Sequence, residues 1–435
     1  MATPFSDGVV SNVSLSGSNN VDSLLAGSKW SNITGTGFNL TYSFGGVNSV
    51  YKADYYDGEP FSGFGELTDT QKDAARNALT AWSEIANLQF TEVTDSDSVA
   101  GDLRFANSSV PDTAETYYPT ASPEAGDVWF GDLEVGEDTT PGSFNYVTRF
   151  LHEIGHALGL KHPHGTNGSG VLADPDIDTT AYTVMSYRSY IGQPIDALQQ
   201  DFYPTTPMLN DIAAIQHIYG ANINTRSGDT VYSWEPNQQL LETIWDGGGT
   251  DTIDWSNQSK DAKINLGAGD WSELGRAYWD GQEPVSQTLA IAYDVTIENA
   301  NGGSGNDAIT GNNAANYLTG GDGHDDLTGL NGDDCLNGGS GNDTIAGGDG
   351  YDKLTGGTGA DTFVFYSPWE GSDCITDFSG KGDKIEISAE GFGIGTNDYD
   401  KFTFDSYTGA LYFDETQFAS LSNPYCVSSP DMAIV

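Results

Sequence analysis

The sequence predicts a multidomain α+β protein, in which a mixed α/β domain precedes an all-β domain built from short parallel strands. Two patterns support this prediction: three histidines between residues 152 and 162 have the spacing of metal ligands, and residues 302–364 repeat with a period of nine. A chain of 435 residues is long enough for two or three domains with separate cores. We expect a flexible N-terminal arm or leader at 1–20, a metal-binding domain at 21–226 and a repeat domain at 227–435.

The first domain contains a well-signalled helix at 68–86. Thr68 and Gln71 have the spacing of a capping box, in which each side chain bonds to the backbone N–H of the other residue. Residues 88–93 and 102–106 alternate in the manner of strands. Apolar residues of the helix recur at helical spacing, at Ala74, Ala78, Trp82 and Ile85.

The segment LHEIGHALGLKHP contains the residue types of a catalytic zinc site. His152 and His156 are four residues apart, so on a helix they lie on one face and can converge on one cation. Glu153 then lies beside the position left for water. Gly159 lets the chain turn, which brings His162 round as a third nitrogen ligand. Three nitrogens and an open position are typical of catalytic rather than structural zinc, and they predict metallopeptidase chemistry.

Helical spacing predicts that the helix carrying these residues spans 143–158. A later helix is expected at 210–219, where Gly220 ends it, and residues 221–228 have the composition of a linker. The buried side of the first helix should carry Phe144, Val147, Leu151, Ile154 and Leu158.

Seven units of nine residues follow one another from Gly302 without a slip in register. Each unit supplies glycines for a tight turn, one oxygen ligand at its sixth position and one apolar residue at its eighth. Because one short strand cannot bury its single apolar side chain, the units must stack as a parallel coil with two units per turn. The sixth positions are Asp307, Asn316, Asp325, Asp334, Asp343, Asp352 and Asp361. The eighth positions are Ile309, Leu318, Leu327, Leu336, Ile345, Leu354 and Phe363.

The rows of aspartates in such a coil require cations, because neighbouring carboxylates repel one another. Ca²⁺ accepts about six to eight oxygens from carboxylates and backbone carbonyls. Units two apart should share an ion, so that Asp325 acts with Asp307 and Asp343, and Asp334 with Asp352. The segment 246–254 fits the same template. The expected calcium ligands are therefore Asp246, Asp251, Asp307, Asp325, Asp334, Asp343, Asp352 and Asp361.

Composition restricts the partners of the chain. Sixteen Lys and Arg against 63 Asp and Glu give a net charge of −47, which argues against nucleic acid or anionic membrane and favours cations. A generally acidic, solubility-enhancing surface is the alternative explanation for part of this excess. Three cysteines are too few for a disulfide framework, and no role is assigned to Cys335, Cys374 or Cys426.

The chain has no run of 18 apolar residues, so no membrane span is predicted. Residues 1–8 lack the basic and apolar regions of a Sec-type signal. If the protein is exported, its signal must therefore lie elsewhere. The last five residues, 431–435, place one acidic residue before a short apolar end.

These two motif sets, in this order, resemble the serralysin family of secreted bacterial zinc endopeptidases, within the metzincin clan. The resemblance rests on the extended zinc motif, on Met185-Ser186-Tyr187, on segment 210–216 and on the repeats. It implies a metzincin-type mixed α/β zinc protease domain followed by a calcium-loaded parallel β-roll. It also implies hydrolysis of internal peptide bonds of extracellular proteins, and export by type I secretion machinery that reads a C-terminal signal. We expect a monomer that binds protein or peptide substrates in an extended cleft.

The resemblance also assigns roles to single residues. Glu153 matches the family's general base, and Met185 matches the residue that forms the apolar floor under the zinc. Tyr187 matches the tyrosine that ligates the metal at rest and stabilises the oxyanion during turnover. In such peptidases a sheet edge above the zinc helix commonly receives the substrate, although the sequence does not identify the strand. The family's zinc ligands match His152, His156 and His162.

The repeats depart from the family's pattern at one place. Asn316 replaces an aspartate, Ala314 replaces the usual glycine in the same unit, and Leu330 and Asn331 alter the turn of the fourth unit. The ion between those units is expected to be weak or missing.

The competing interpretation of the whole chain is a calcium-dependent extracellular binding or surface-attachment protein with an inactive zinc domain.

Overall fold

The computed structural model describes residues 10–31, 33–51, 55, 58–131, 138–195, 198–379, 382–422 and 432–435, which divide into two compact units. The first division follows Thr225, one residue before the expected boundary at 226/227, but residues 239–247 and 277–285 return to the first unit. The first unit comprises Met1–Thr225, Gln239–Gly247 and Ala277–Val285, and the second comprises Arg226–Gln238, Gly248–Arg276 and Ser286–Val435.

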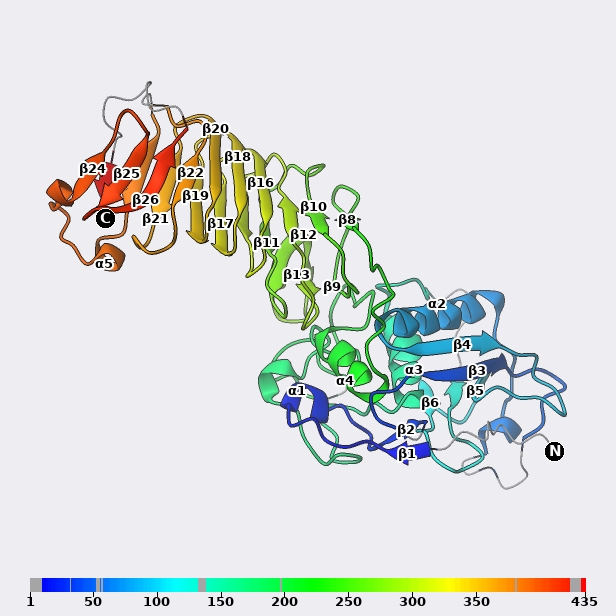
Figure 1. Ribbon diagram of the computed structural model, residues 1–435. Coiled ribbons are helices and arrows are strands. Elements are labelled where there is room, and N and C mark those ends of the chain that lie inside the picture. The colour runs from blue at the N-terminus through cyan, green and yellow to red at the C-terminus, as the bar shows by residue number, and fades with distance from the viewer. Residues whose placement is uncertain are drawn as a thin grey trace. The chain divides into compact units, whose positions relative to one another are not determined.

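The first unit combines helices with one five-stranded sheet (Figure 1). The sheet has the order β4-β3-β5-β7-β6, and only β6 runs antiparallel to its neighbour. This architecture agrees with the predicted mixed α/β domain. In chain order the elements are β1 (Val10–Asn12), α1 (Asn19–Asp22), β2 (Ser28–Trp30), β3 (Phe38–Phe44), η1 (Glu59–Phe61), α2 (Asp69–Ile85), β4 (Leu88–Glu92), β5 (Leu103–Asn107), β6 (Ala114–Thr116), β7 (Asp127–Phe130), η2 (Tyr146–Leu151), α3 (His152–Ala157), η3 (Pro175–Ile177), α4 (Leu209–Tyr219) and β9 (Glu242–Ile244).

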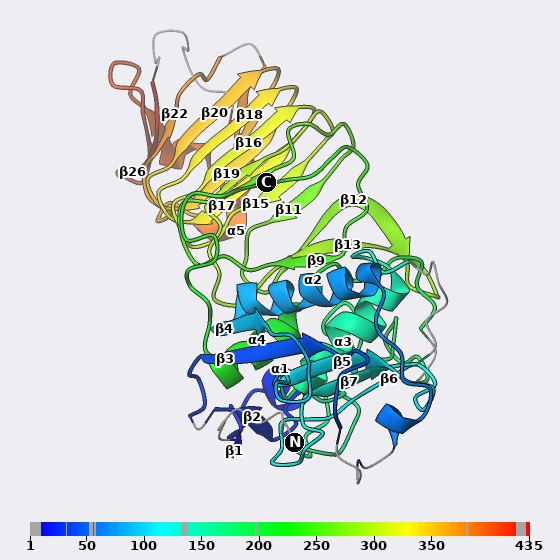
Figure 2. The same ribbon diagram turned by 90° about the vertical axis from the view of Figure 1, so that its right-hand side faces the viewer.

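Helix α2 confirms the helix predicted at 68–86. Thr68 caps it, and the reciprocal bonds of the capping box with Gln71 are both present. The helix runs along the sheet (Figure 2), and its Trp82 side chain is fully buried. The indole N–H of Trp82 donates to the backbone oxygen of Leu151 at 3.2 Å. This contact anchors the zinc-motif helix against α2.

The expected flexible arm at 1–20 is wrong for its second half. Residues 10–12 form β1, which pairs antiparallel with β2, and α1 begins at Asn19. Asp22 explains part of this order, because its buried carboxylate accepts hydrogen bonds from the backbone N–H groups of Ser16 and Gly17. Residues 1–9 lie outside the described residues.

The second unit is almost entirely β-structure (Figure 1). One of its sheets has the strand order β24-β25-β26-β22-β20-β18-β16-β14-β10-β8, and the other contains the run β27-β23-β21-β19-β17-β15-β11-β12. Its elements, including most of β12 and β13, are β8 (Val231–Ser233), β10 (Thr252–Asp254), β11 (Lys263–Asn265), β12 (Trp271–Trp279), β13 (Pro284–Ile291), β14 (Asn299–Asn301), β15 (Ala308–Thr310), β16 (Tyr317–Asp322), β17 (Asp326–Asn331), β18 (Cys335–Ser340), β19 (Thr344–Asp349), β20 (Lys353–Thr358), β21 (Thr362–Phe365), β22 (Asp373–Ile375), β23 (Lys384–Ile387), α5 (Ala389–Phe392), η4 (Tyr399–Lys401), β24 (Phe402–Phe404), β25 (Ala410–Phe413), β26 (Thr416–Leu421) and β27 (Met432–Ile434).

The repeats form the predicted parallel coil. Units two apart are hydrogen-bonded neighbours, so Leu318 pairs with Leu336 in one sheet and Leu327 pairs with Ile345 in the other. The apolar eighth positions all point inward and are at most 1% exposed: Ile309, Leu318, Leu327, Leu336, Ile345, Leu354 and Phe363. These side chains are the core of the coil.

Stacking at this spacing leaves no room for a side chain at Gly339. Gly339 has φ +110°, and a Cβ atom there would lie 2.1 Å from the backbone oxygen of Gly321 in the neighbouring coil. Both the backbone conformation and the close approach therefore require glycine.

We predict that Gly339→Ala destabilises the second unit by at least about 2 kcal/mol, because it combines a left-handed backbone with a steric clash. Gly228→Ala is the matched control, since a Cβ at that exposed position meets nothing within 4 Å. Thermal unfolding of both variants at saturating calcium measures the difference. Equal melting temperatures would contradict the close-packing argument.

Candidate functional site

Three imidazoles converge in the first unit, as the spacing predicts. His162 Nε2 lies 3.0 Å from His152 Nε2 and 2.9 Å from His156 Nε2, and the three ligand atoms are all within 4.8 Å of one another. The turn that returns the chain to His162 passes through Gly159, which has φ +104°. A Cβ atom on Gly159 would lie 2.4 Å from the backbone oxygen of Ser28, so only glycine fits this turn.

Backbone carbonyls orient two of these imidazoles. His152 Nδ1 lies 2.7 Å from the oxygen of Val184, and His156 Nδ1 lies 2.7 Å from the oxygen of Leu160. A carbonyl only accepts, so each Nδ1 carries the proton and each Nε2 keeps its lone pair. Burial lowers the pKa of His152 and lowers the pKa of His156 to about 4. Neutral imidazoles whose Nε2 lone pairs face one point fit a zinc ion.

Glu153 projects from the same helix into a buried position. Its carboxylate accepts a hydrogen bond from the hydroxyl of Thr116 at 2.7 Å, and burial raises its pKa to about 8. Thr116 ends β6, the antiparallel edge strand of the sheet. The base candidate and the sheet edge therefore meet at one place, which the sequence did not reveal.

Met185 is fully buried, and its sulfur packs against Gly155 of the zinc helix. A Cβ atom on Gly155 would lie 2.6 Å from Met185 Sδ, so the glycine within the zinc motif makes room for the methionine. This packing is consistent with the expected apolar floor beneath the histidines.

Asp211 on α4 holds the turn that contains Met185. Its carboxylate accepts hydrogen bonds from the hydroxyl of Thr183 at 2.6 Å and from the backbone N–H of Val184 at 2.8 Å. Since the oxygen of Val184 orients His152, Asp211 supports an expected metal ligand indirectly. Sequence reasoning assigned Asp211 no role, because the contact joins residues 27 positions apart.

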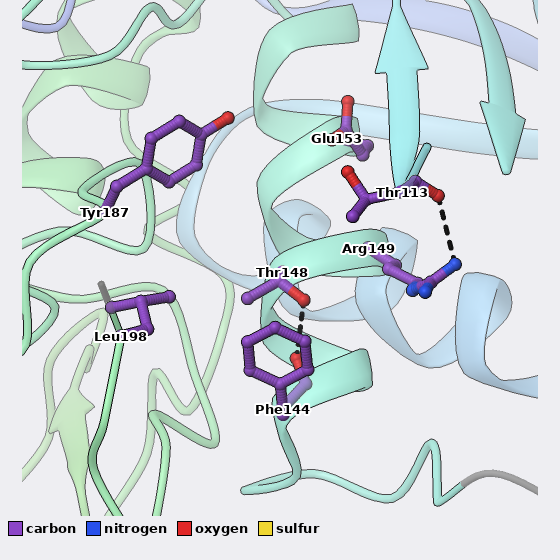
Figure 3. Close-up of a pocket in the computed structure, with 7 residues that line it drawn as sticks. All are labelled: Thr113, Phe144, Thr148, Arg149, Glu153, Tyr187 and Leu198. Atoms are coloured by element: carbon purple, nitrogen blue, oxygen red, sulfur yellow. Dashed lines mark hydrogen bonds between the residues drawn. The ribbon is translucent and has the colours of Figure 1, made fainter. Parts of the chain in front are cut away.

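Tyr187 lies against the histidine cluster. Its ring stacks on His152 at 5.2 Å with an interplanar angle of 14° and lies 4.5 Å from the ring of His162. Figure 3 shows its hydroxyl pointing toward the helix that carries Glu153. The tyrosine is therefore placed beside the expected metal position.

The helix before His152 differs from the prediction. Residues 146–151 form a π-helical turn, in which the N–H of His152 bonds to the oxygen of Val147, five residues earlier. Such a wider turn shifts the phase of every residue before it, and π turns are frequent at functional sites. Phe144, expected on the buried side, is instead 43% exposed.

This phase shift brings Phe144 and Thr148 to a pocket of about 290 Å³ beside Glu153 (Figure 3). Arg149 also lines the pocket, and its guanidinium donates to the backbone oxygen of Thr113 at 3.0 Å. The hydroxyl of Thr148 donates to the backbone oxygen of Phe144. The pocket is lined by Thr113, Phe144, Thr148, Arg149, Glu153, Tyr187 and Leu198.

In the second unit, the aspartates of the repeats form two buried rows. Within each row one carboxylate oxygen accepts the backbone N–H of the preceding coil, as Asp343 Oδ1 does from Asp325 at 2.9 Å and Asp352 Oδ1 from Asp334 at 2.8 Å. The other oxygen of the interior aspartates has no hydrogen-bond partner, which applies to Asp325, Asp334, Asp343 and Asp352. Burial raises the pKa of Asp325 to about 6 and of Asp334 to about 7.

The rows extend beyond the nine-residue period. Asp352 and Asp361 donate their backbone N–H groups to Asp373 and Asp383, which sequence reasoning missed because insertions separate them from the repeats. Asp251 precedes β10 and also lies in a row, since its N–H donates to Glu298. Asp246 lies outside both rows, because residues 239–247 belong to the first unit.

Comparison with known proteins finds one family match in the first half of the chain and another mostly in the second half. Residues 65–169 match the Matrixin family, and residues 210–423 match the family described as Peptidase M10 serralysin C terminal. The chain is 38% identical over 286 residues to serralysin of Proteus mirabilis, covering 58% of this chain and 56% of that protein.

Two further relatives give similar values. Metalloprotease AprA of Pseudomonas entomophila is 36% identical over 320 residues, covering 67% of this chain and 63% of its own. Serralysin C of Dickeya chrysanthemi is 38% identical over 304 residues, covering 64% and 60%. The chain thus spans about three fifths of the length of these relatives. From the two family matches and these identities, the chain belongs to the serralysin family.

Proposed function

We propose that this chain is a secreted zinc-dependent endopeptidase that hydrolyses internal peptide bonds of extracellular proteins, with one catalytic zinc and several structural calcium ions. One observation carries the proposal: three neutral imidazoles converge beside a buried glutamate and a tyrosine, namely His152, His156, His162, Glu153 and Tyr187. The relatives named serralysin and metalloprotease support it.

The site divides the reaction among its residues. Zinc, when bound by the three imidazoles, supplies a Lewis acid that acidifies water and polarises a carbonyl. Glu153 takes the proton of the attacking water and passes it to the leaving amine, a role that suits a buried carboxyl of raised pKa. Tyr187 donates its hydroxyl to the oxygen on which negative charge develops.

Two features beside Glu153 suit a peptide substrate. β6 is the edge strand of the sheet and carries Thr116, which bonds to Glu153, so an extended peptide can add to this edge. The adjoining pocket receives the side chain of the residue that supplies the leaving amine, since Glu153 protonates that amine. Phe144 and Leu198 give the pocket apolar walls, which favour an apolar side chain.

The second unit binds calcium through its two rows of aspartates. The unpartnered, buried oxygens of Asp325, Asp334, Asp343 and Asp352 support this proposal, because buried carboxylates without a counter-ion are strongly unfavourable. Burial raises the pKa of these groups for the same reason.

Asn316 replaces an aspartate within one row and needs no ion at that position. Its amide nitrogen donates to the backbone oxygen of Glu298 at 2.9 Å and to Asn312 Oδ1 at 3.1 Å, while its oxygen accepts the N–H of Asn312. The amide thus satisfies a position where a second carboxylate would need a cation. This supports the expectation of a missing ion near this turn.

Export completes the proposal. No helix among the described residues is long and apolar enough to cross a membrane. The apolar end at Met432–Ile434 forms β27, which pairs with β23, whereas Asp431 lies outside the described residues. The family match supports type I secretion machinery as the proposed partner, with the C-terminal strand folding into the roll after export. Cys335 and Cys374 are free thiols, and Cys426 lies outside the described residues.

Replacement of the base tests the mechanism. Glu153→Gln should retain bound zinc and lower kcat/KM on azocasein by about 10²–10⁴-fold, because it removes proton transfer but little volume. Glu390→Gln, an exposed carboxyl of the second unit, should leave activity unchanged. An active Glu153→Gln enzyme would refute the assignment of the base.

Metal removal separates the peptidase from the competing binding protein. We expect 1,10-phenanthroline to abolish azocasein hydrolysis by the wild-type chain, and added zinc to restore it. A chain that hydrolyses nothing before chelation, yet adheres to a surface in a calcium-dependent manner, would favour the binding protein.

Calcium titration followed by far-UV circular dichroism tests the second unit. We expect β-structure to appear with added calcium, and Asp325→Ala to raise the midpoint of the titration because it removes an unpartnered ligand oxygen. Asp322→Ala, an exposed aspartate three residues earlier, is the matched control. Full β-structure in the presence of a calcium chelator would contradict the proposal.

A further inference from the structure

We propose that Asp178 is a positioning residue for Tyr187, holding the side chains of the residues on both sides of the tyrosine and a histidine that packs against its ring. The inference rests on the proposed function, in which Tyr187 stabilises the oxyanion. Asp178 follows η3, is 2% exposed and lies within no sequence motif.

The carboxylate of Asp178 bonds to the residues that flank Tyr187. Its Oδ1 accepts the hydroxyl of Ser186 at 2.7 Å, and its Oδ2 forms an ion pair with the guanidinium of Arg188. The backbone N–H of Arg188 also donates to the Ser186 hydroxyl, at 3.1 Å. One buried side chain therefore fixes the residue before the tyrosine and the residue after it.

The backbone reinforces this arrangement. The N–H of Thr180 donates to the oxygen of Arg188 at 2.8 Å, so the segment after Asp178 runs beside the segment that carries Tyr187. The Thr180 hydroxyl bonds in turn to Gln200. Because these groups are buried, movement of the tyrosine segment would leave several polar groups unpaired, which is costly.

His164 brings the same carboxylate to the histidine cluster. Its Nδ1 lies 3.4 Å from Asp178 Oδ1, and its ring stacks on His162 at 5.4 Å with an interplanar angle of 15°. The ring of His164 also lies 5.4 Å from that of Tyr187. Tyr187 thus packs among three imidazoles, one of which is held by Asp178.

The charge of Asp178 suits this role. Burial raises its pKa, but the hydrogen bonds from His164 and Ser186 and the charge of Arg188 outweigh burial and hold the pKa below its ordinary value. The group is therefore a carboxylate at neutral pH and can accept from all three neighbours. An amide at this position would keep one acceptor and lose the ion pair with Arg188.

The test compares Asp178→Ala, Asp178→Asn and Tyr187→Phe with the double variant Asp178→Ala/Tyr187→Phe. We expect Asp178→Ala to lower kcat by about 10- to 100-fold, somewhat less than the loss of an oxyanion donor, with KM and zinc content nearly unchanged. Asp178→Asn should fall between this variant and the wild type. The double variant should be no slower than Tyr187→Phe, since the aspartate acts only through the tyrosine. Multiplied losses, or an unchanged kcat, would overturn the proposal.

A spectroscopic measurement tests the positioning role of Asp178 independently of activity. In the copper(II)-substituted protein, a tyrosinate near the metal gives a phenolate-to-copper charge-transfer band. We expect this band in the wild type and in Asp176→Ala, an exposed neighbour used as control, and its loss in Asp178→Ala and Tyr187→Phe. A band that survives in Asp178→Ala, or is absent from the wild type, would overturn the positioning role. An inactive wild type that shows the expected pattern of bands would refute only the proposed function.

Discussion

The hydrogen bonds that orient His152 and His156 are the constraint on which the first unit depends. Each Nδ1 faces a backbone oxygen, from Val184 and Leu160, so that each Nε2 is free to face a metal. The structure around the histidines serves this arrangement. Asp211 holds the backbone that includes Val184, and the glycine at 155 admits the methionine beneath. A catalytic centre of few residues thus relies on contacts from several distant segments.

The second unit meets a different constraint, which is the burial of like charges. Its coil brings aspartates into rows. Asp325, Asp334, Asp343 and Asp352 each give one oxygen to a backbone N–H while the other stays unpartnered. Such rows are stable only with a cation or with a neutral substitute. Asn316 is such a substitute, because its amide supplies its own donors. Part of the large negative charge of the chain therefore lies in these buried rows.

Much of the fold was predictable, because its signals are short-range. The capping box at Thr68, the helical spacing of His152 and His156, and the inward eighth positions of the repeats all appear as expected. The predictions were wrong or incomplete where the structure departs from a regular helical or nine-residue spacing. The π-helical turn moved Phe144 from the core to a pocket, and insertions hid Asp373 and Asp383 from the nine-residue period.

The sequence by itself identified the candidate site residues, since helical and nonapeptide spacing bring them together through neighbouring residues alone. Only the tertiary structure decided what supports them. Thr116 reaches Glu153 across 37 positions, and Val184 reaches His152 across 32. Asp178 and Ser186 likewise meet through a loop whose path no periodicity encodes. These contacts depend on how the whole unit packs, because their geometry is set by side chains far apart in the chain.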